Sequence, residues 1–206
     1  MYMNRSGLSR IIPIVLVLAA IGLAIWALIS VGRMFFSGSG NGSESQATQQ
    51  VNVGKQALTN TTADRSVRMT VRGPIVADEN FHSYSITISP DARNMTTYVG
   101  YLGQQVDTQQ LTNNIPAYEQ LVYALDRANL MEGTPLSGTA NDTRGICATG
   151  SLYEFEVLQG SNSIQKLWTS TCEGSPGSLK ASLSQITNLF RQQIPSFSQL
   201  ISKINV

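Results

Sequence analysis

The chain has 206 residues and a formal net charge of +1, which leaves room for one domain of ordinary size with appendages. Only 13% of its residues are charged, against about 25% in typical soluble domains. Three of the 14 Lys and Arg residues lie within residues 1–33, which leaves 11 of them against 13 Asp and Glu, a net charge of −2 for the rest of the chain. A near-neutral domain lacks the basic surface that nucleic-acid binding requires, so we expect no nucleic-acid partner.

An uncharged apolar segment lies near the N-terminus. Residues 11–32, "IIPIVLVLAAIGLAIWALISVG", carry no charge over 22 positions, and a helix of that length matches a hydrocarbon core of about 30 Å. A cleaved signal peptide is the alternative, but its apolar region is shorter, roughly 7–15 residues, and no small-x-small cleavage site follows here. The sequence therefore predicts an uncleaved transmembrane helix over residues 11–33 that holds the chain in a lipid bilayer.

The charges beside this segment predict its orientation. Arg5 and Arg10 precede it, whereas Arg33 alone follows it before Lys55. The excess of positive charge marks the cytoplasmic side. We therefore expect a single-pass protein of the cell membrane, with residues 1–10 in the cytoplasm and residues 34–206 extracytoplasmic.

A segment rich in Gly and Ser follows the apolar one. Residues 37–50, "SGSGNGSESQATQQ", have no apolar period with which to pack and are typical of a flexible tether. A short helix around residues 51–58 is left open. We assign residues 34–66 to a linker and residues 67–206 to an extracytoplasmic domain.

Alternating apolar and polar residues predict strands in that domain. The pattern occurs in "VRMTVRGPIV" from residue 67, in "FHSYSITIS" from residue 81 and in "MTTYVGY" from residue 95. Two further alternating runs, residues 152–158 and 164–171, surround "QGSN" and predict a β-hairpin.

Helical periodicity appears twice. Residues 115–130 carry an apolar stripe at helical spacing, with Asn114 where an N-cap belongs. Residues 178–193 carry another, with Ser178 as the candidate cap. The fold class is therefore α+β: an antiparallel sheet of about five strands in the chain order βββαββα, with two helices covering one face.

Cys147 and Cys172 are predicted to form a disulfide. With the hairpin loop centred on residues 160–161, Tyr153 faces Trp168, and the parity of the two strands places both cysteines on the same face at the open end. Two thiols held together outside the cytoplasm oxidise to each other. The loop that they close stabilises the fold by about 3–4 kcal/mol in the chain-entropy model.

The chemistry-bearing residues do not form a catalytic or metal-binding set. Two cysteines and one histidine are fewer than the four ligands that zinc usually takes, and we expect no cofactor. Ser163 and Lys166 match a Ser-x-x-Lys spacing, but they begin a predicted strand, where they point to opposite faces. Glu154 and Glu156 alternate onto the polar side of their strand, which predicts a solvated face.

One basic cluster, formed by Arg65, Arg68 and Arg72, is a possible contact for an anionic ligand. The alternative, which the sequence favours, is an exposed edge strand protected by charge.

His82 is the only imidazole, and it lies on the apolar face of its strand. A structural role is the expected one. The alternative is a surface hydrolase that uses His82 with the carboxylate of Asp78 or Glu79.

The segments "RMTVRGPIVADENF", "NDTRGICATG" and "KLWTSTC", behind such an N-terminal anchor, carry a resemblance. The chain resembles small single-pass membrane proteins of unknown function from reduced-genome bacteria of the Saccharibacteria type. The resemblance implies a bacterial cytoplasmic membrane and an extracytoplasmic domain, and it transfers no functional residues.

The expected function is a non-enzymatic binding module of the cell envelope, which engages another envelope protein or a surface polymer. The alternatives are the hydrolase described above and a structural subunit of a membrane assembly. A large exposed apolar patch would be the sign of the structural subunit.

Overall fold

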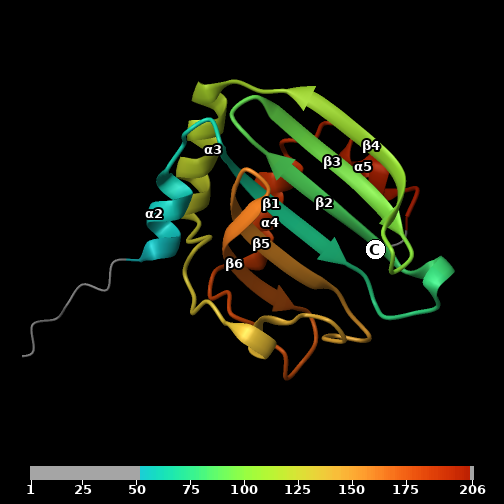
Figure 1. Ribbon diagram of the computed structural model, residues 1–206. Coiled ribbons are helices and arrows are strands. Elements are labelled where there is room, and N and C mark those ends of the chain that lie inside the picture. Colours follow the sequence, from blue (N-terminus) through green and yellow to red (C-terminus); the bar gives the residue numbers. More distant parts are fainter. Residues whose placement is uncertain (1–51, 205–206) are drawn as a thin grey trace, which may run out of the picture. The chain divides into compact units, whose positions relative to one another are not determined.

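The computed structural model of the protein describes residues 52–204, in which six strands form one antiparallel sheet (Figure 1). The strands lie side by side in the order β4-β3-β2-β1-β5-β6. Their bounds are β1 Arg65–Arg72, β2 His82–Ile88, β3 Ala92–Val99, β4 Gln104–Thr112, β5 Leu152–Gln159 and β6 Asn162–Ser170.

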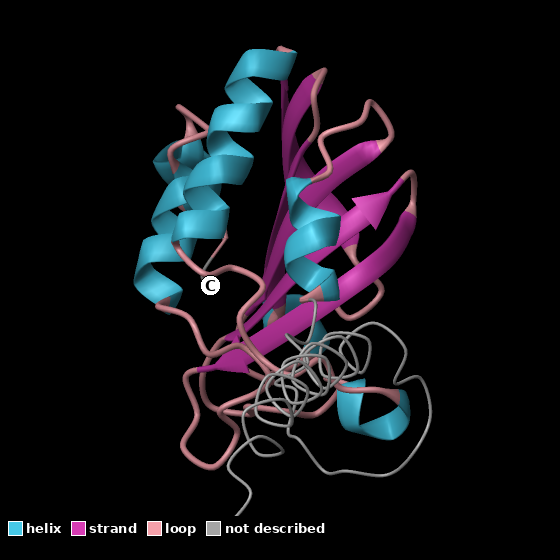
Figure 2. Ribbon diagram, turned by 90° about the vertical axis from the view of Figure 1, so that its left-hand side faces the viewer, coloured by secondary structure: helices cyan, strands magenta, loops and turns pink. Residues whose placement is uncertain are grey.

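The helices gather on one face of the sheet, as Figure 2 shows for the longer ones. They are α2 Val53–Thr59, α3 Ile115–Arg127, α4 Leu183–Arg191 and α5 Phe197–Ile201, with short 3₁₀ turns η1 Asp78–Asn80 and η2 Gly138–Asn141. Figure 1 views β1, β2 and β3 from the opposite side, where none of the helices in residues 52–204 covers them. We call this side the uncovered face.

The core lies between the sheet and the helices because every second strand residue points to that side. Met69, Ile86 and Phe155 are fully buried there, and Phe155 packs on Phe190 of α4 with ring centroids 6.1 Å apart. The apolar stripe of α3 closes the same core through Tyr118, Leu121, Val122 and Leu125. The α+β class and the antiparallel sheet are therefore confirmed.

The sheet has six strands where the sequence predicts about five. The additional strand, β4, reads QQVDTQQLT, and its residues are exposed or half-buried throughout. A polar edge strand of this kind has no apolar alternation to reveal it. Its pairing with β3 is what makes it a strand.

The two predicted helices are found, and both are shorter than predicted, because α3 ends at Arg127 and α4 spans Leu183–Arg191. Asn114 caps α3 by accepting a hydrogen bond from the Ala117 N–H, as expected. The predicted cap Ser178, in contrast, lies outside α4, which begins after Ser182. The hydroxyl of Ser178 instead accepts a hydrogen bond from the Trp168 N–H of β6.

α2 lies inside the range assigned to the linker, at the position of the helix that the sequence left open. Its Leu58 is buried in the core, and Lys55 pairs with Asp126 of α3 at 3.1 Å. The folded part of the chain therefore begins before residue 67. The predicted transmembrane segment, residues 11–33, and the Gly/Ser tether lie outside the described residues; within residues 52–204, no helix has the length and apolarity needed to cross a membrane.

Two details of the predicted sheet are wrong. β1 is an interior strand that pairs with β2 and β5, so its arginines do not protect an exposed edge. The β5–β6 hairpin is shifted by one residue because its register changes between Val157 and Leu158. Trp168 consequently lies opposite Glu154 rather than Tyr153.

Candidate functional site

The uncovered face carries a group of charged side chains at the junction of β1, β5 and β6. Strand parity places Arg68 and Arg72 of β1, Glu154 and Glu156 of β5, and Lys166 of β6 on this one side. Together they line a cleft of about 380 Å³ with Thr70, Ser85 and Tyr98. We call it the charged cleft.

Arg68 and Glu156 form the first ion pair of the cleft. They lie directly opposite each other in the β1–β5 register. Both Nε and Nη2 of Arg68 lie 2.7 Å from Oε2 of Glu156. Charge-assisted bonds of this length fix the orientation of the guanidinium plane.

The second group of bonds converges on Glu154. Its Oε2 pairs with Nη2 of Arg72 at 2.9 Å, and its Oε1 accepts hydrogen bonds from the Thr143 hydroxyl at 2.9 Å and from Nζ of Lys166 at 3.3 Å. Nη1 of Arg72 also donates to Thr143, and Lys166 donates to the Asn141 carbonyl. The loop between α3 and β5 is thus tied to the cleft at two points.

The prediction that Glu154 and Glu156 form a solvated face is wrong. They lie on the polar side of β5, but only 5% and 8% of their surfaces are exposed. The three cations and the loop that carries Thr143 cover them. Buried carboxylates are retained when they are paired in this way, because an unpaired buried charge costs several kcal/mol.

The charged cleft holds more positive than negative charge. Three cations face two carboxylates, which leaves an excess of +1. The side chains of Arg68, Arg72 and Lys166 remain 34%, 39% and 23% exposed. A ligand can therefore reach the cations, whereas the carboxylates are shielded behind them.

An apolar pocket adjoins the charged cleft, and Arg72 lines both. The pocket has a volume of about 440 Å³. Its apolar walls include the stacked rings of Phe81 and Tyr101, whose centroids lie 4.3 Å apart. The other apolar lining residues are Ile75, Ile146 and Leu152.

Arg144 supplies a second guanidinium to this pocket. Hydrogen bonds from the Arg144 side chain and backbone lower the pKa of Asp142 to about 2, and in return the hydrogen bond and charge of Asp142 raise the pKa of Arg144. Both groups therefore stay ionised at every physiological pH.

Arg65 does not join the other two arginines. It has odd parity on β1 and so points to the helix-covered side, toward Tyr118. Burial raises the pKa of Tyr118 to about 12, and the charge of Arg65 opposes that shift. Of the three predicted contacts for an anion, Arg68 and Arg72 lie in the charged cleft and Arg65 does not.

The structure does not bring together the acid–histidine pair that the hydrolase alternative requires. Among the described residues, Nδ1 of His82 is buried without a hydrogen-bond partner. Asp78 instead accepts a 2.7 Å hydrogen bond from the Tyr101 N–H. No group of three His, Cys, Asp or Glu side chains that could hold a metal ion occurs within residues 52–204.

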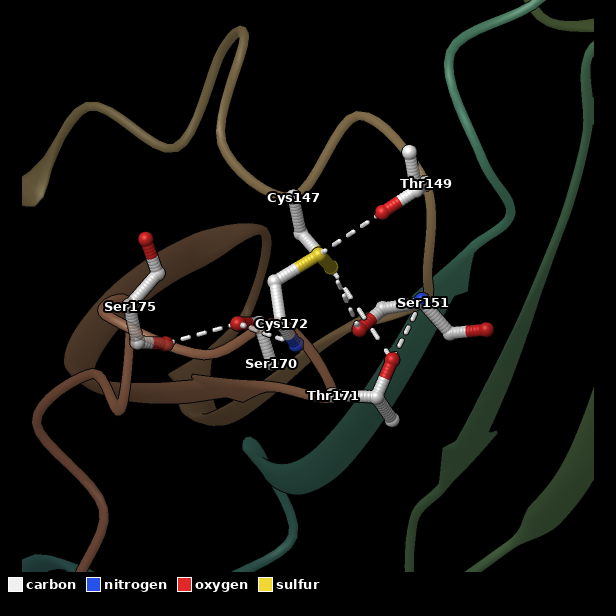
Figure 3. The surroundings of a disulfide bond; sticks show 7 residues. All are labelled: Cys147, Thr149, Ser151, Ser170, Thr171, Cys172 and Ser175. Carbon is white, nitrogen blue, oxygen red and sulfur yellow. Dashed lines mark hydrogen bonds between the residues drawn. A yellow bond between two sulfur atoms is a disulfide. The ribbon is translucent and has the colours of Figure 1, made fainter.

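The predicted disulfide between Cys147 and Cys172 is confirmed (Figure 3). It joins the loop before β5 to the end of β6, and a hydrogen bond from the Ser151 N–H to the Thr171 hydroxyl lies beside it. A side chain at Gly150 would meet this hydroxyl at 2.3 Å, so glycine is required there. The bond anchors the loop residues that line the apolar pocket, among them Ile146.

No protein-family model matches this chain, and a search of curated proteins finds no match either. The charged cleft and the apolar pocket are therefore the features that indicate a function for this chain.

Sequence reasoning missed two components of the site. Thr143 and Lys166 complete the bonds around Glu154, but they lie in a loop and on a neighbouring strand. The predicted register, with Tyr153 facing Trp168, places Lys166 opposite Phe155, whereas the one-residue shift of the hairpin puts it opposite Glu156. The apolar pocket combines residues from separate loops and left no local pattern in the sequence.

Proposed function

We propose that this protein is a membrane-anchored extracytoplasmic binding module, held by residues 11–33, whose domain binds an anionic ligand in the charged cleft. The observation that carries the proposal is the excess of partly exposed cations over shielded carboxylates on the uncovered face of the sheet. Cations grouped in a cleft attract anions more strongly than isolated surface cations do.

The carboxylates support this role because they orient the cations before a ligand arrives. Within residues 52–204, Arg68 uses Nε and Nη2 in its ion pair and Arg72 uses Nη1 and Nη2, so each retains N–H groups for a ligand. Groups that are already fixed lose less conformational entropy on binding. The hydroxyls of Thr70, Ser85 and Tyr98 provide further polar contacts along the cleft.

Exposed apolar residues lie near one end of the sheet, and an exposed apolar patch is the sign expected of a structural subunit. Ile75, Val76, Tyr101 and Leu102 are exposed there. Two of them line the apolar pocket, and the Tyr101 hydroxyl binds the Val76 carbonyl. We therefore assign this group to ligand binding rather than to an assembly interface.

The test is the binding of a carboxylate polymer. The full chain in nanodiscs of neutral lipid is titrated with labelled polyglutamate, and polylysine serves as the probe of opposite charge. We expect saturable binding of polyglutamate alone, which weakens as salt is raised because ions screen exposed charges.

The matching variant is the double substitution Arg68→Gln with Glu156→Gln, which removes one ion pair without leaving a buried charge unpaired. It removes a ligand-facing cation, so we expect polyglutamate binding to weaken several-fold. Arg127→Gln, an exposed arginine on α3, is the control. Unchanged binding in the double variant, or none in the unsubstituted chain, contradicts the proposal.

A further inference from the structure

The apolar pocket has the dimensions of a small-molecule site. Its volume of about 440 Å³ falls within the range of roughly 300–1,000 Å³ that is common for ligand pockets. Such pockets combine apolar walls with a few polar groups that orient the ligand. Here the walls are the Phe81–Tyr101 stack, Ile75, Ile146 and Leu152, and the polar groups are mainly guanidiniums.

The charges around the pocket select an anion. Arg72 and Arg144 both line it, and the side chain of Arg144 is 87% exposed. Arg72 shares its carboxylate partner, Glu154, with Lys166, so this acid does not neutralise both cations. Arg144 pairs with Asp142 through Nε and Nη2 and, in the part of the chain that is described, makes no bond through Nη1.

The wall of the pocket is held in place before a ligand binds. Thr143 is fixed by its bonds to Arg72 and Glu154, and Cys147 is fixed by the disulfide. Arg144 and Ile146 lie between these two anchors. A preformed wall lowers the entropic cost of binding.

We infer that this pocket binds a small amphipathic carboxylate, whose apolar chain lies against the Phe81–Tyr101 stack and Ile146 and whose carboxylate pairs with Arg72 and Arg144. The inference rests on the proposed anion-binding role of the same sheet face and names a ligand class for it. Arg72 joins the two sites, so a ligand with further negative groups would extend into the charged cleft.

The test uses short alkyl carboxylates as probes. The full chain in nanodiscs is titrated calorimetrically with butanoate, hexanoate and octanoate, and empty nanodiscs give the reference for partition into lipid. Each methylene buried in an apolar wall raises affinity roughly fourfold, so hexanoate should bind about 16-fold more tightly than butanoate. Hexanol, which has no charge, should bind roughly tenfold more weakly than hexanoate, since a hydrogen bond to a charged group contributes at least that much.

Three variants locate the binding. Tyr101→Ala removes one wall and should weaken hexanoate binding at least tenfold, whereas Tyr101→Phe keeps the ring and should bind nearly as well. Tyr123→Ala, at an exposed position on α3, is the matched control. If Tyr101→Ala does not fold, Ile75→Ser tests the same wall and should also weaken binding.

A free alkyl carboxylate and the end of a peptide chain present the same chemistry. An acetylated tripeptide ending in leucine, compared with its C-terminal amide, distinguishes them. Tighter binding of the peptide acid than of hexanoate identifies a chain terminus as the ligand, and tighter binding of hexanoate identifies a free acid.

Absence of saturable hexanoate binding, absence of a chain-length dependence, or unchanged binding in Tyr101→Ala overturns the inference. The double variant at Arg68 and Glu156 separates it from the proposed function, because that variant should weaken polyglutamate binding several-fold and leave hexanoate binding unchanged. Polyglutamate binding without hexanoate binding would refute the carboxylate site in the pocket alone. Hexanoate binding without polyglutamate binding would refute the charged cleft as a site for polymers and would leave the pocket site standing.

Discussion

The two faces of the sheet bury their residues by different means. On the helix-covered face, Met69, Ile86 and Phe155 are excluded from water by α3, α4 and α5. On the uncovered face, Glu154 and Glu156 are nearly as buried, but ion pairs and one loop cover them instead. Apolar burial on the first face stabilises the fold. Desolvation of the charges on the second face offsets part of that stabilisation and leaves these charges close to solvent.

This difference indicates where function resides. On the covered face, the docked helices already bury the apolar side chains, which leaves no surface there for a ligand. The uncovered face keeps three partly exposed cations and an apolar pocket side by side. Measurements of the free energy of unfolding on each face test this difference.

The largest effect is expected on the covered face. Phe155→Ala removes a fully buried ring that packs on Phe190, and large-to-small changes at such sites cost about 4 kcal/mol. Urea unfolding measures the change in the free energy of unfolding. Tyr123→Ala, on the exposed side of α3, should change it by less than about 0.5 kcal/mol. Equal losses in the two variants would mean that this face is not the core.

Loss of the disulfide should have the next largest effect. Cys147 and Cys172 are 25 residues apart, and a loop of that size stabilises the fold by about 3.5 kcal/mol in the chain-entropy model. The double substitution of both cysteines by serine should lower the free energy of unfolding by that amount. In the unsubstituted chain, mass spectrometry after alkylation without reductant should find neither thiol labelled. Two alkylated thiols in the purified chain would refute the pairing.

On the uncovered face, Glu154→Ala should cost about 3 kcal/mol because Arg72 and Lys166 lose their shared partner. Glu154→Gln keeps an acceptor for Thr143 and should cost less. Glu119→Ala on α3 is the exposed control. A loss below 1 kcal/mol in Glu154→Ala would show that solvent screens these pairs and that the two faces differ less than proposed.

The smallest effect is a pH dependence that belongs to the covered face. Burial raises the pKa of Tyr118 to about 12, against about 10 in the unfolded chain. The resulting stabilisation is fully present below pH 10 and is lost as pH rises through 12, on the order of 2 kcal/mol in total. Unfolding measured from pH 8 to 11 should show a shallower decline in Tyr118→Phe than in the unsubstituted chain. Tyr123→Phe should leave the slope unchanged, and an identical slope in Tyr118→Phe would show that Tyr118 does not carry the effect.

The sequence predicted elements whose residues repeat with a clear period. The apolar alternation of β1, β2 and β5 and the stripe of α3 each reflect one buried side, and Asn114 marks a cap chemically. β4 was not predicted because most of its residues are Gln, Thr and Asp and none of them is fully buried, so the strand has no apolar alternation. The β5–β6 register was wrong because the irregularity after Val157 depends on the pairing geometry rather than on residue type.

The charged cleft was predictable only in pieces. Periodicity placed Arg68, Arg72, Glu154 and Glu156 on polar sides of their strands, but it does not say which strands are neighbours. Arg68 and Glu156 are 88 residues apart, and the loop that covers Glu154 lies in no regular element. Burial of the carboxylates follows from that tertiary arrangement and from nothing local.

The ion pairs of the cleft also bear on how the chain finds its fold. Every neighbouring pair of strands in the sheet is consecutive in sequence except β1 and β5. Hairpin contacts are local and form quickly. Pairing of β1 with β5 has to close a long loop and is therefore expected to be the slow step. A slip of two residues there would keep each apolar side chain on its own face, so apolar burial alone does not forbid it. It would, however, move Arg68 away from Glu156, its direct partner on β5. The charges on the uncovered face therefore favour the observed register of the longest-range strand pairing in the sheet.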